Sequence, residues 1–340
     1  MSLVSDYLPG ACANLQTGVN AGCSRDPRTK QGFSQQVIAL SEQYNPFGVT
    51  FDSATGKERI IDIKYSPRVV DNGNYDDIAD ICNGATVGTY NSISVEANLK
   101  TSVEEEIPFE DIRVLCENPS EFRGMRISKM FNAMMEKVNH INLTYIDTIT
   151  PYLINGGAGQ FNIDLVVGSS GARTVNSEAL VAVLEGLADI GCGVEPVWVG
   201  NAAELVEASY LLNVGCCNTN SGIDLSQING QYMYFKDNKA NSILGTGHTI
   251  AMIPGSIIMM PWYRNVGEYA GSTATTFYEV ITDPITGMQY DLTIREVDCP
   301  TRKIVMQLSL HWHLWTLPDD YYLSGDSLYQ TKGFLRPVLT

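Results

Sequence analysis

The feature that most constrains the fold of this chain is a long run of helical periodicity that begins at residue 119. Asn118 is a suitable N-cap, Pro119 suits the first helical position, and Glu121 completes a capping box. Apolar residues then recur at spacings of three and four, at Ile127, Met130, Phe131, Met134, Val138, Ile141, Tyr145 and Ile149. The pattern predicts one helix over residues 119–150, closed by Pro151. At roughly 45 Å it is long for a globular protein.

An antiparallel meander is predicted over residues 276–317. The segments FYEVITD and MQYDLTIREVD meet across the turn DPITGM, where Pro284 and Gly287 supply the turn chemistry. A second turn, DCPT, leads into the strand RKIVMQLSLHWHLWTL. One face of this strand is predicted to carry the apolar residues Ile304, Met306, Leu308, Leu310, Trp312 and Leu314, and the other face Gln307, Ser309, His311 and His313.

The N-terminal third shows extended segments and little apolar patterning. Residues 1–46 are rich in Gly, Pro, Asn and Ser, and they predict an arm that lies across something else, with one short helix near Val37–Leu40. Two alternating segments follow, with Ile61, Ile63 and Tyr65 in the first and Ile93, Val95 and Ala97 in the second. A polar, Gly-rich stretch separates them. We expect a large hairpin whose charged faces do not pack into the core of its own chain.

Residues 152–275 have the pattern of an α/β domain. Strands are predicted in the stretches QFNIDLVVG, VEPVWVG, QYMYF and HTIAMIPGSIIMM. Helices are predicted in SEALVAVLEGLADIG, which Gly191 ends, and in the segment that Asn201 and Glu204 open.

No residues form a convincing catalytic, cofactor-binding or metal site. His311 and His313 lie about 7 Å apart on one strand face, but only His140 and His248 remain as further histidines and no zinc-protease spacing is present. A polar sheet face or a subunit contact is the favoured interpretation of this pair. The Gly-rich stretches at 154–161 and 244–248 match neither phosphate-binding pattern. We therefore predict no cofactor, no metal and no enzyme activity.

Charge and cysteine usage exclude further classes. The net charge of −16 disfavours a protein that binds nucleic acid through a basic surface. No secretory signal is predicted, and the most apolar stretch, residues 250–262, is broken by Pro254 and Pro261 and is too short to span a membrane. The eight cysteines contain no C-x-x-C pair, which indicates free thiols in a reducing cytoplasm.

The order of these elements resembles that of the major capsid proteins of tailed bacteriophages, the Hong Kong 97-type fold. Two stretches carry the likeness. EALVAVLEGLADIGCGVEPVWVGNAAELVEASYL is similar to the helix–strand–helix part of the axial domain, and YEVITDPITGMQYDLTIREVDCPTRKIVMQLSLHWHLW to the closing strands of the peripheral domain. The resemblance implies an α+β fold with an N-arm, an E-loop hairpin, a P-domain with a long spine helix, and an A-domain.

The resemblance also implies boundaries and a role. The N-terminal arm would span residues 1–48, the E-loop hairpin 49–110, the spine helix 111–154, the A-domain 155–275, and the closing P-domain strands with a C-terminal tail 276–340. Such a chain self-assembles, as pentamers and hexamers, into the icosahedral shell around the double-stranded DNA of a phage, which it contacts without sequence specificity. Further candidate partners are scaffolding, portal and decoration proteins, with no membrane. The chain would be assembled in the host cytoplasm and reside in the virion.

Two alternatives stay open from the sequence. An encapsulin-like nanocompartment shell would share the fold but enclose cargo enzymes. A metal-dependent hydrolase using His311 and His313 belongs to a different class, and stoichiometric metal in a small oligomer would distinguish it.

Overall fold

The computed structural model describes part of the 340-residue chain: residues 32–34, 37–38, 50–53, 60–65, 91–108, 119–149, 161–163, 165–167, 173–175, 197–200, 233–237, 239–245, 248–263, 276–297, 303–316 and 334–339. The predicted helices near 177–191 and after Asn201 lie outside these residues, as do Asn118 and all eight cysteines. Helices and strands are mixed, as the α+β prediction requires.

The long helix is α5, Pro119–Thr148, and its 30 residues confirm the predicted element. Its buried stripe includes Ile127, Met130, Phe131, Met134 and Val138, as expected. Toward its C-terminal end the stripe departs from the prediction. Ile141, Tyr145 and Ile149 are only partly buried, and the fully buried positions are Asn139, Asn142, Leu143 and Ile146. Both sets of positions recur at spacings of three and four, so periodicity could not distinguish them, and the prediction took the more apolar set.

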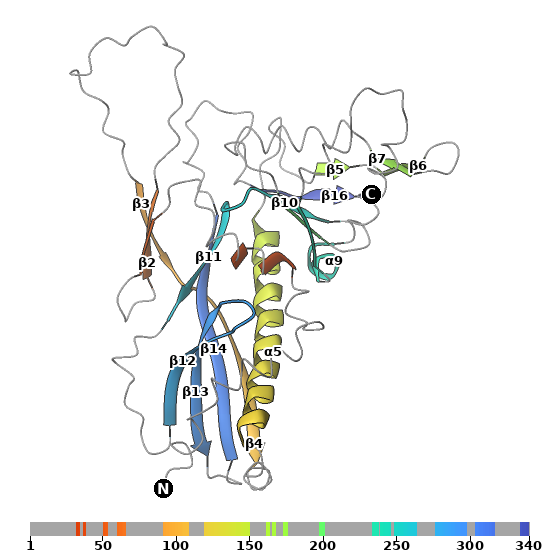
Figure 1. Ribbon diagram of the computed structural model, residues 1–340. Coiled ribbons are helices and arrows are strands. Elements are labelled where there is room, and N and C mark those ends of the chain that lie inside the picture. Colours follow the sequence, from red (N-terminus) through yellow and green to blue (C-terminus); the bar gives the residue numbers. More distant parts are fainter. Residues whose placement is uncertain are drawn as a thin grey trace, which may run out of the picture.

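The largest sheet contains five strands: β4 (Leu99–Pro108), β11 (Ile257–Trp262), β12 (Thr276–Thr282), β13 (Gln289–Val297) and β14 (Lys303–Thr316). We call it the large sheet. Strand β14 is antiparallel to three of the others (Figure 1). Strand β4 pairs along one edge of it, while β11 and β13 share the opposite edge. The predicted meander is therefore confirmed.

One face of the large sheet packs against α5. All six predicted inward residues of β14 are buried, and the ring centroids of Phe131 on α5 and Tyr290 on β13 lie 5.5 Å apart. The turn between β12 and β13 also forms as predicted. Gly287 has a φ of +72°, which favours glycine, and Asp283 accepts the Ile285 amide at 3.1 Å.

The other face of the large sheet is more buried than its polar pattern predicts. His311 is 8% exposed, Trp315 4% and Val305 2%. Charged residues on this face form ion pairs, Lys303 with Glu106 at 2.7 Å and Arg295 with Glu104 at 3.6 Å.

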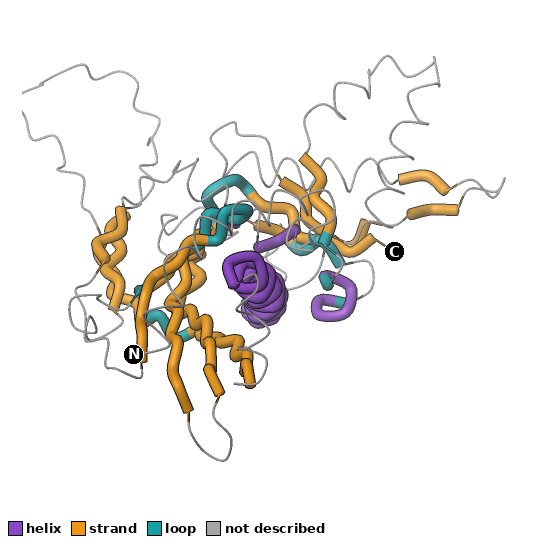
Figure 2. The backbone as a smooth tube through the Cα atoms, turned by 60° about the horizontal axis from the view of Figure 1, so that its bottom comes forward, coloured by secondary structure: helices purple, strands orange, loops and turns teal. Residues whose placement is uncertain are grey.

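A smaller sheet has the order β15 (Phe334–Leu335), β10 (Ile250–Met252), β8 (Val197–Gly200) and β9 (Met233–Lys236), and a short helix, α9 (Ala240–Leu244), follows β9. We call it the small sheet. Two strand pairs lie nearby: β5 (Phe161–Ile163) with β16 (Pro337–Leu339), and β6 (Leu165–Val167) with β7 (Arg173–Val175). Figure 2 shows α5 nearly end-on, between the large sheet and the strands beside α9.

Two predicted strands are each divided in the structure. The stretch 160–168 forms both β5 and β6, and the stretch 248–260 contributes to both β10 and β11. The second break is a turn at residues 253–256, where Gly255 has a φ of +86°. This turn lets β10 join the small sheet while β11 joins the large one.

The predicted hairpin is present as β2 (Ile60–Tyr65) and β3 (Asn91–Glu96), with β1 (Thr50–Ser53) alongside (Figure 1). Two features differ from the expectation that it stays out of the core of its own chain. Ile61, Ile63 and Tyr65 are buried, and the second segment continues into β4, whose Ile107 lies in the main core. Because β4 pairs with β14 over ten positions, that half of the segment is part of the large sheet.

None of the helices in the described part of the chain has an apolar stretch long enough to span a bilayer.

Candidate functional site

A buried carboxylate beside α5 is the centre of an extensive polar network. Asp237 follows β9 and is 0% exposed. Its Oδ2 accepts the Phe33 amide at 3.0 Å and Asn139 Nδ2 at 2.9 Å, and its Oδ1 accepts the Lys239 amide at 2.8 Å. Three N–H donors therefore compensate a charge that burial would otherwise make costly.

Two asparagines of α5 extend this network. Asn139 Oδ1 accepts the Ser34 amide at 3.1 Å, and Asn142 Nδ2 donates to Ser34 Oγ at 2.9 Å. Asn142 Oδ1 accepts the indole N–H of Trp312 on β14 at 2.8 Å. We call Ser34, Asn139, Asn142, Asp237 and Trp312 the junction, and each of the five is fully buried.

The junction joins four parts of the chain that are far apart in sequence. Ser34 comes from the N-terminal region, the asparagines from α5, Asp237 from the end of β9, and Trp312 from the large sheet. The Asp237 amide also donates to the Gly200 carbonyl of β8 at 2.6 Å, which secures it to the small sheet. A buried polar group is stable only where its hydrogen-bond partners are correctly placed. The junction therefore favours one arrangement of these four parts of the chain.

The N-terminal residues at the junction also bury apolar side chains. Phe33 and Val37 are 0% exposed and Ile38 is 8% exposed, all within the main core. The sequence predicted a short helix near Val37, and residues 32–34 and 37–38 are helical. The expectation that this arm lies across something else is wrong for these residues, because they pack inside their own subunit.

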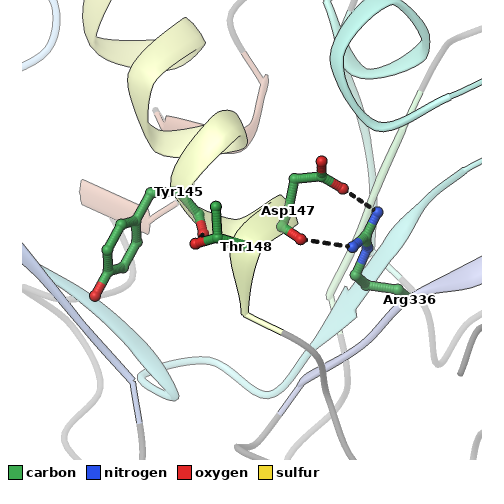
Figure 3. A network of polar contacts seen from close by, with 4 residues as sticks. All are labelled: Tyr145, Asp147, Thr148 and Arg336. Carbon is green, nitrogen blue, oxygen red and sulfur yellow. Dashed lines mark hydrogen bonds and ion pairs between the residues drawn. The ribbon is translucent and has the colours of Figure 1, made fainter. Parts of the chain in front are cut away.

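The C-terminal end of α5 has a second polar contact, drawn in Figure 3. Arg336, between β15 and β16, donates to the Asp147 carboxylate at 2.6 Å and to the Asp147 backbone carbonyl at 3.3 Å. The last turn of α5 contains no basic residue of its own. Arg336 therefore supplies, from a segment far away in sequence, the positive charge that is favourable near a helix C-terminus.

His248 lies in the electrostatic field of this contact. Burial lowers the pKa of His248 below its usual 6.5, the charge of Arg336 lowers it further, and Asp147 opposes both. The neutral imidazole is thus favoured in the folded chain.

The two histidines singled out in the sequence lie where the strand pattern put them. His311 packs edge-on against Trp262 of β11, with ring centroids 5.9 Å apart. Burial lowers the pKa of His313, against a smaller opposing effect of a hydrogen bond with the Glu96 backbone. In the described part of the chain, no three His, Cys, Asp or Glu residues are grouped so that they could hold a metal ion.

A hollow of about 450 Å³ lies over the exposed side of α5. Its lining includes Thr101 of β4, Lys137 and His140 of α5, and Lys239 ahead of α9. Lys137 is already engaged, since its Nζ donates to the Ser102 carbonyl of β4 at 2.7 Å. This bond and the Arg126–Glu105 ion pair hold β4 against the helix.

The sequence did not predict the junction. Its visible signal was the pair Asn139 and Asn142, polar residues placed at core spacing on a helix whose other inward residues are apolar. Asp237 and Ser34 carried no comparable signal, because their roles depend on contacts between segments that lie far apart in sequence.

No family model matches the chain, and no curated protein matches it either. Solved structures do match. A chain of the capsid asymmetric unit of cyanophage A-1(L) is similar over 92% of this chain and 92% of that one, with a TM-score of 0.50 and 9% sequence identity. This chain has the fold of a phage capsid subunit.

Two further structures are similar over most of their length. A chain from Mycobacterium phage Che8 has a TM-score of 0.41 and 8% identity, covering 86% of this chain and 93% of that one. A chain from the capsid of cyanophage P-SCSP1u has a TM-score of 0.43 and 10% identity, covering 84% and 85%. The match to cyanophage A-1(L) supports the capsid fold, and the α+β fold inferred from the order of elements is confirmed.

Proposed function

We propose that this chain is the major capsid protein of a tailed phage, a structural subunit that is not an enzyme. The observation that carries the proposal is the match to the capsid chain of cyanophage A-1(L) over nearly the whole length of both chains. The match covers most of a chain that contains both a projecting hairpin and a long helix. Both features serve a subunit whose surfaces are shared with neighbours in a closed, symmetric assembly.

The proposed division of the chain follows from the same fold. Helix α5 with the large sheet corresponds to the P-domain, the small sheet to the A-domain, and β2–β3 to the E-loop. In the described part of the chain, four strands connect these regions across the boundaries inferred from sequence. Strand β4, from residues assigned to the E-loop, and β11, from residues assigned to the A-domain, both pair with β14. Strands β15 and β16, from the C-terminal tail, pair with β10 and β5.

The proposed partners are copies of the same chain, in pentamers and hexamers, around packaged double-stranded DNA. A net charge of −16 suits a wall that does not hold the genome tightly. Scaffolding, portal and decoration proteins are further proposed partners, and the proposed location is the virion, after assembly in the host cytoplasm.

The alternatives gain no support from the described residues. A hydrolase using His311 and His313 would need further ligands beside them, and in this part of the chain no such group is assembled. An encapsulin-like shell would share the fold, so only the contents of the particle distinguish it.

Expression of the full chain, followed by light scattering and negative-stain electron microscopy, tests the proposal. We expect closed shells, tubes, or free pentamers and hexamers. Shells that enclose a single cellular enzyme would favour the nanocompartment. A monomer or dimer with stoichiometric bound metal would favour the hydrolase, and a chain that stays monomeric at high concentration and with added polyethylene glycol would argue against any shell.

A further inference from the structure

Residues 32–34 and 37–38 have a position that an arm ordered only by neighbouring subunits would not have. Phe33, Ser34 and Val37 are fully buried within one chain. We propose that this segment is a clip, which each subunit closes by itself before assembly, and that the closed clip fixes the position of α5 relative to the small sheet. The consequence for shell geometry rests on the proposed function, whereas the clip itself does not.

The clip is expected to close in the free subunit, because its withdrawal would leave polar and apolar groups of the same subunit without their partners. Withdrawal of the segment removes the Phe33 amide from Asp237, and the Ser34 amide and hydroxyl from Asn139 and Asn142. Each of these groups is buried, and a buried polar group that loses its partner keeps its desolvation cost. Withdrawal would also leave an apolar gap where Phe33 and Val37 had packed. These two losses favour the closed state without help from a neighbour.

The clip holds α5 because its partners belong to different layers. Asn139 and Asn142 fix the helix, and Asp237 is bonded to Gly200 of the small sheet at 2.6 Å. Trp312 adds the large sheet through Asn142. A shift of α5 against the small sheet would break the Asn139–Asp237 hydrogen bond of 2.9 Å and both bonds to Ser34 together. These hydrogen bonds therefore form and break together.

Asp237 is the positioning residue of this clip, because its site needs a group that only accepts hydrogen bonds. The amides of Phe33 and Lys239 and the Asn139 side chain all donate to its two oxygens. An Asp237→Asn substitution keeps the shape but points an NH₂ group at one of these donors. If the Asn139 side chain rotated so that its oxygen accepted this NH₂ group, that oxygen would no longer accept the Ser34 amide.

Hydrogen exchange of the full-length, unassembled subunit tests the clip. In the unchanged protein, peptides covering residues 32–38 should exchange at least about a hundredfold more slowly than an unstructured peptide. Asp237→Asn should speed that exchange at least about tenfold, while peptides from the middle of β14 stay protected. Asp62→Asn is the matched control, since Asp62 accepts the exposed Ser94 hydroxyl at 2.5 Å on the hairpin and should leave the clip unchanged.

The outcomes separate the clip from the proposed function. Unprotected residues 32–38 in the free subunit, or full protection in Asp237→Asn, would overturn the clip even if shells form. Protected residues in a chain that never assembles would support the clip and count against the capsid role. If Asp237→Asn does not fold, Ser34→Ala removes only the hydroxyl that Asn142 donates to, and it should give a smaller loss of protection in the same peptides. In assembling protein, an opened clip should broaden the distribution of particle diameters.

Discussion

Two of the contacts that hold helix α5 against distant parts of the chain, the junction and the Arg336–Asp147 contact, differ in burial. At the junction, every partner is fully shielded from solvent. At the C-terminal end, the Arg336 side chain is 8% exposed but its partner Asp147 is 45% exposed. Water can replace Arg336 at Asp147, whereas nothing replaces a missing partner at the junction. Burial, more than the number of bonds, should therefore decide which contact determines the fold.

The largest effect is expected from Asn142→Ala. This change removes the acceptor of the Trp312 indole and the donor to Ser34 Oγ, and it leaves both groups buried. The free energy of unfolding should fall by about 3 kcal/mol. Urea unfolding of the unassembled subunit, followed by tryptophan fluorescence, measures it. Thr144→Ala on the exposed side of the same helix removes a bond to the His140 carbonyl and is the control. Similar losses in the two variants would contradict the comparison.

A smaller effect is expected from Arg336→Ala. It removes both bonds to Asp147 and the positive charge near the end of α5, and the half-exposed carboxylate is then rehydrated. We expect a loss of about 1 kcal/mol in the same unfolding experiment. Glu104→Gln is the control, because its ion pair with Arg295 is about half exposed on both sides and should contribute less than about 0.5 kcal/mol. A loss that equals that of Asn142→Ala would show that exposure does not separate the two contacts.

The smallest effect is a pH dependence at the C-terminal contact. The pKa of His248 is lower in the folded chain than its usual 6.5, so the unfolded chain binds a proton first as the pH falls. Stability should therefore decrease as the pH drops through 6.5, and this contribution levels off below the folded pKa. His248→Gln should reduce the slope of unfolding free energy against pH in this window. Parallel slopes for the two proteins would show that His248 does not titrate differently on folding.

The parts of the fold that could be predicted from the sequence are those governed by local periodicity. Helix α5 and strand β14 both bury apolar residues at regular spacing. Each could therefore be predicted from its own segment of sequence alone. The last turns of α5 were not. There the inward positions include Asn139 and Asn142, and polar residues are tolerated because Ser34, Asp237 and Trp312 satisfy them.

The sequence pattern also did not predict which strands pair with each other when the partners are far apart in sequence. The stretch that became β10 and β11 has one apolar pattern, yet the turn at Gly255 directs its halves to different sheets. Burial of the face that carries His311 and Trp315 was likewise missed, because a strand pattern says which residues share a face and not what covers it.

Strand β14 has a further consequence, for the order in which the chain can fold during synthesis. All three of its sheet partners precede it in sequence, and β4 at residues 99–108 precedes it by far the most. Helix α5 is complete long before residues 303–316 leave the ribosome. During that interval the large sheet lacks β14 and cannot cover the apolar stripe of α5. Such delayed, long-range pairing makes folding slow and exposes apolar surface on the way. A nascent chain of this kind needs protection from aggregation from the time α5 is complete until β14 emerges.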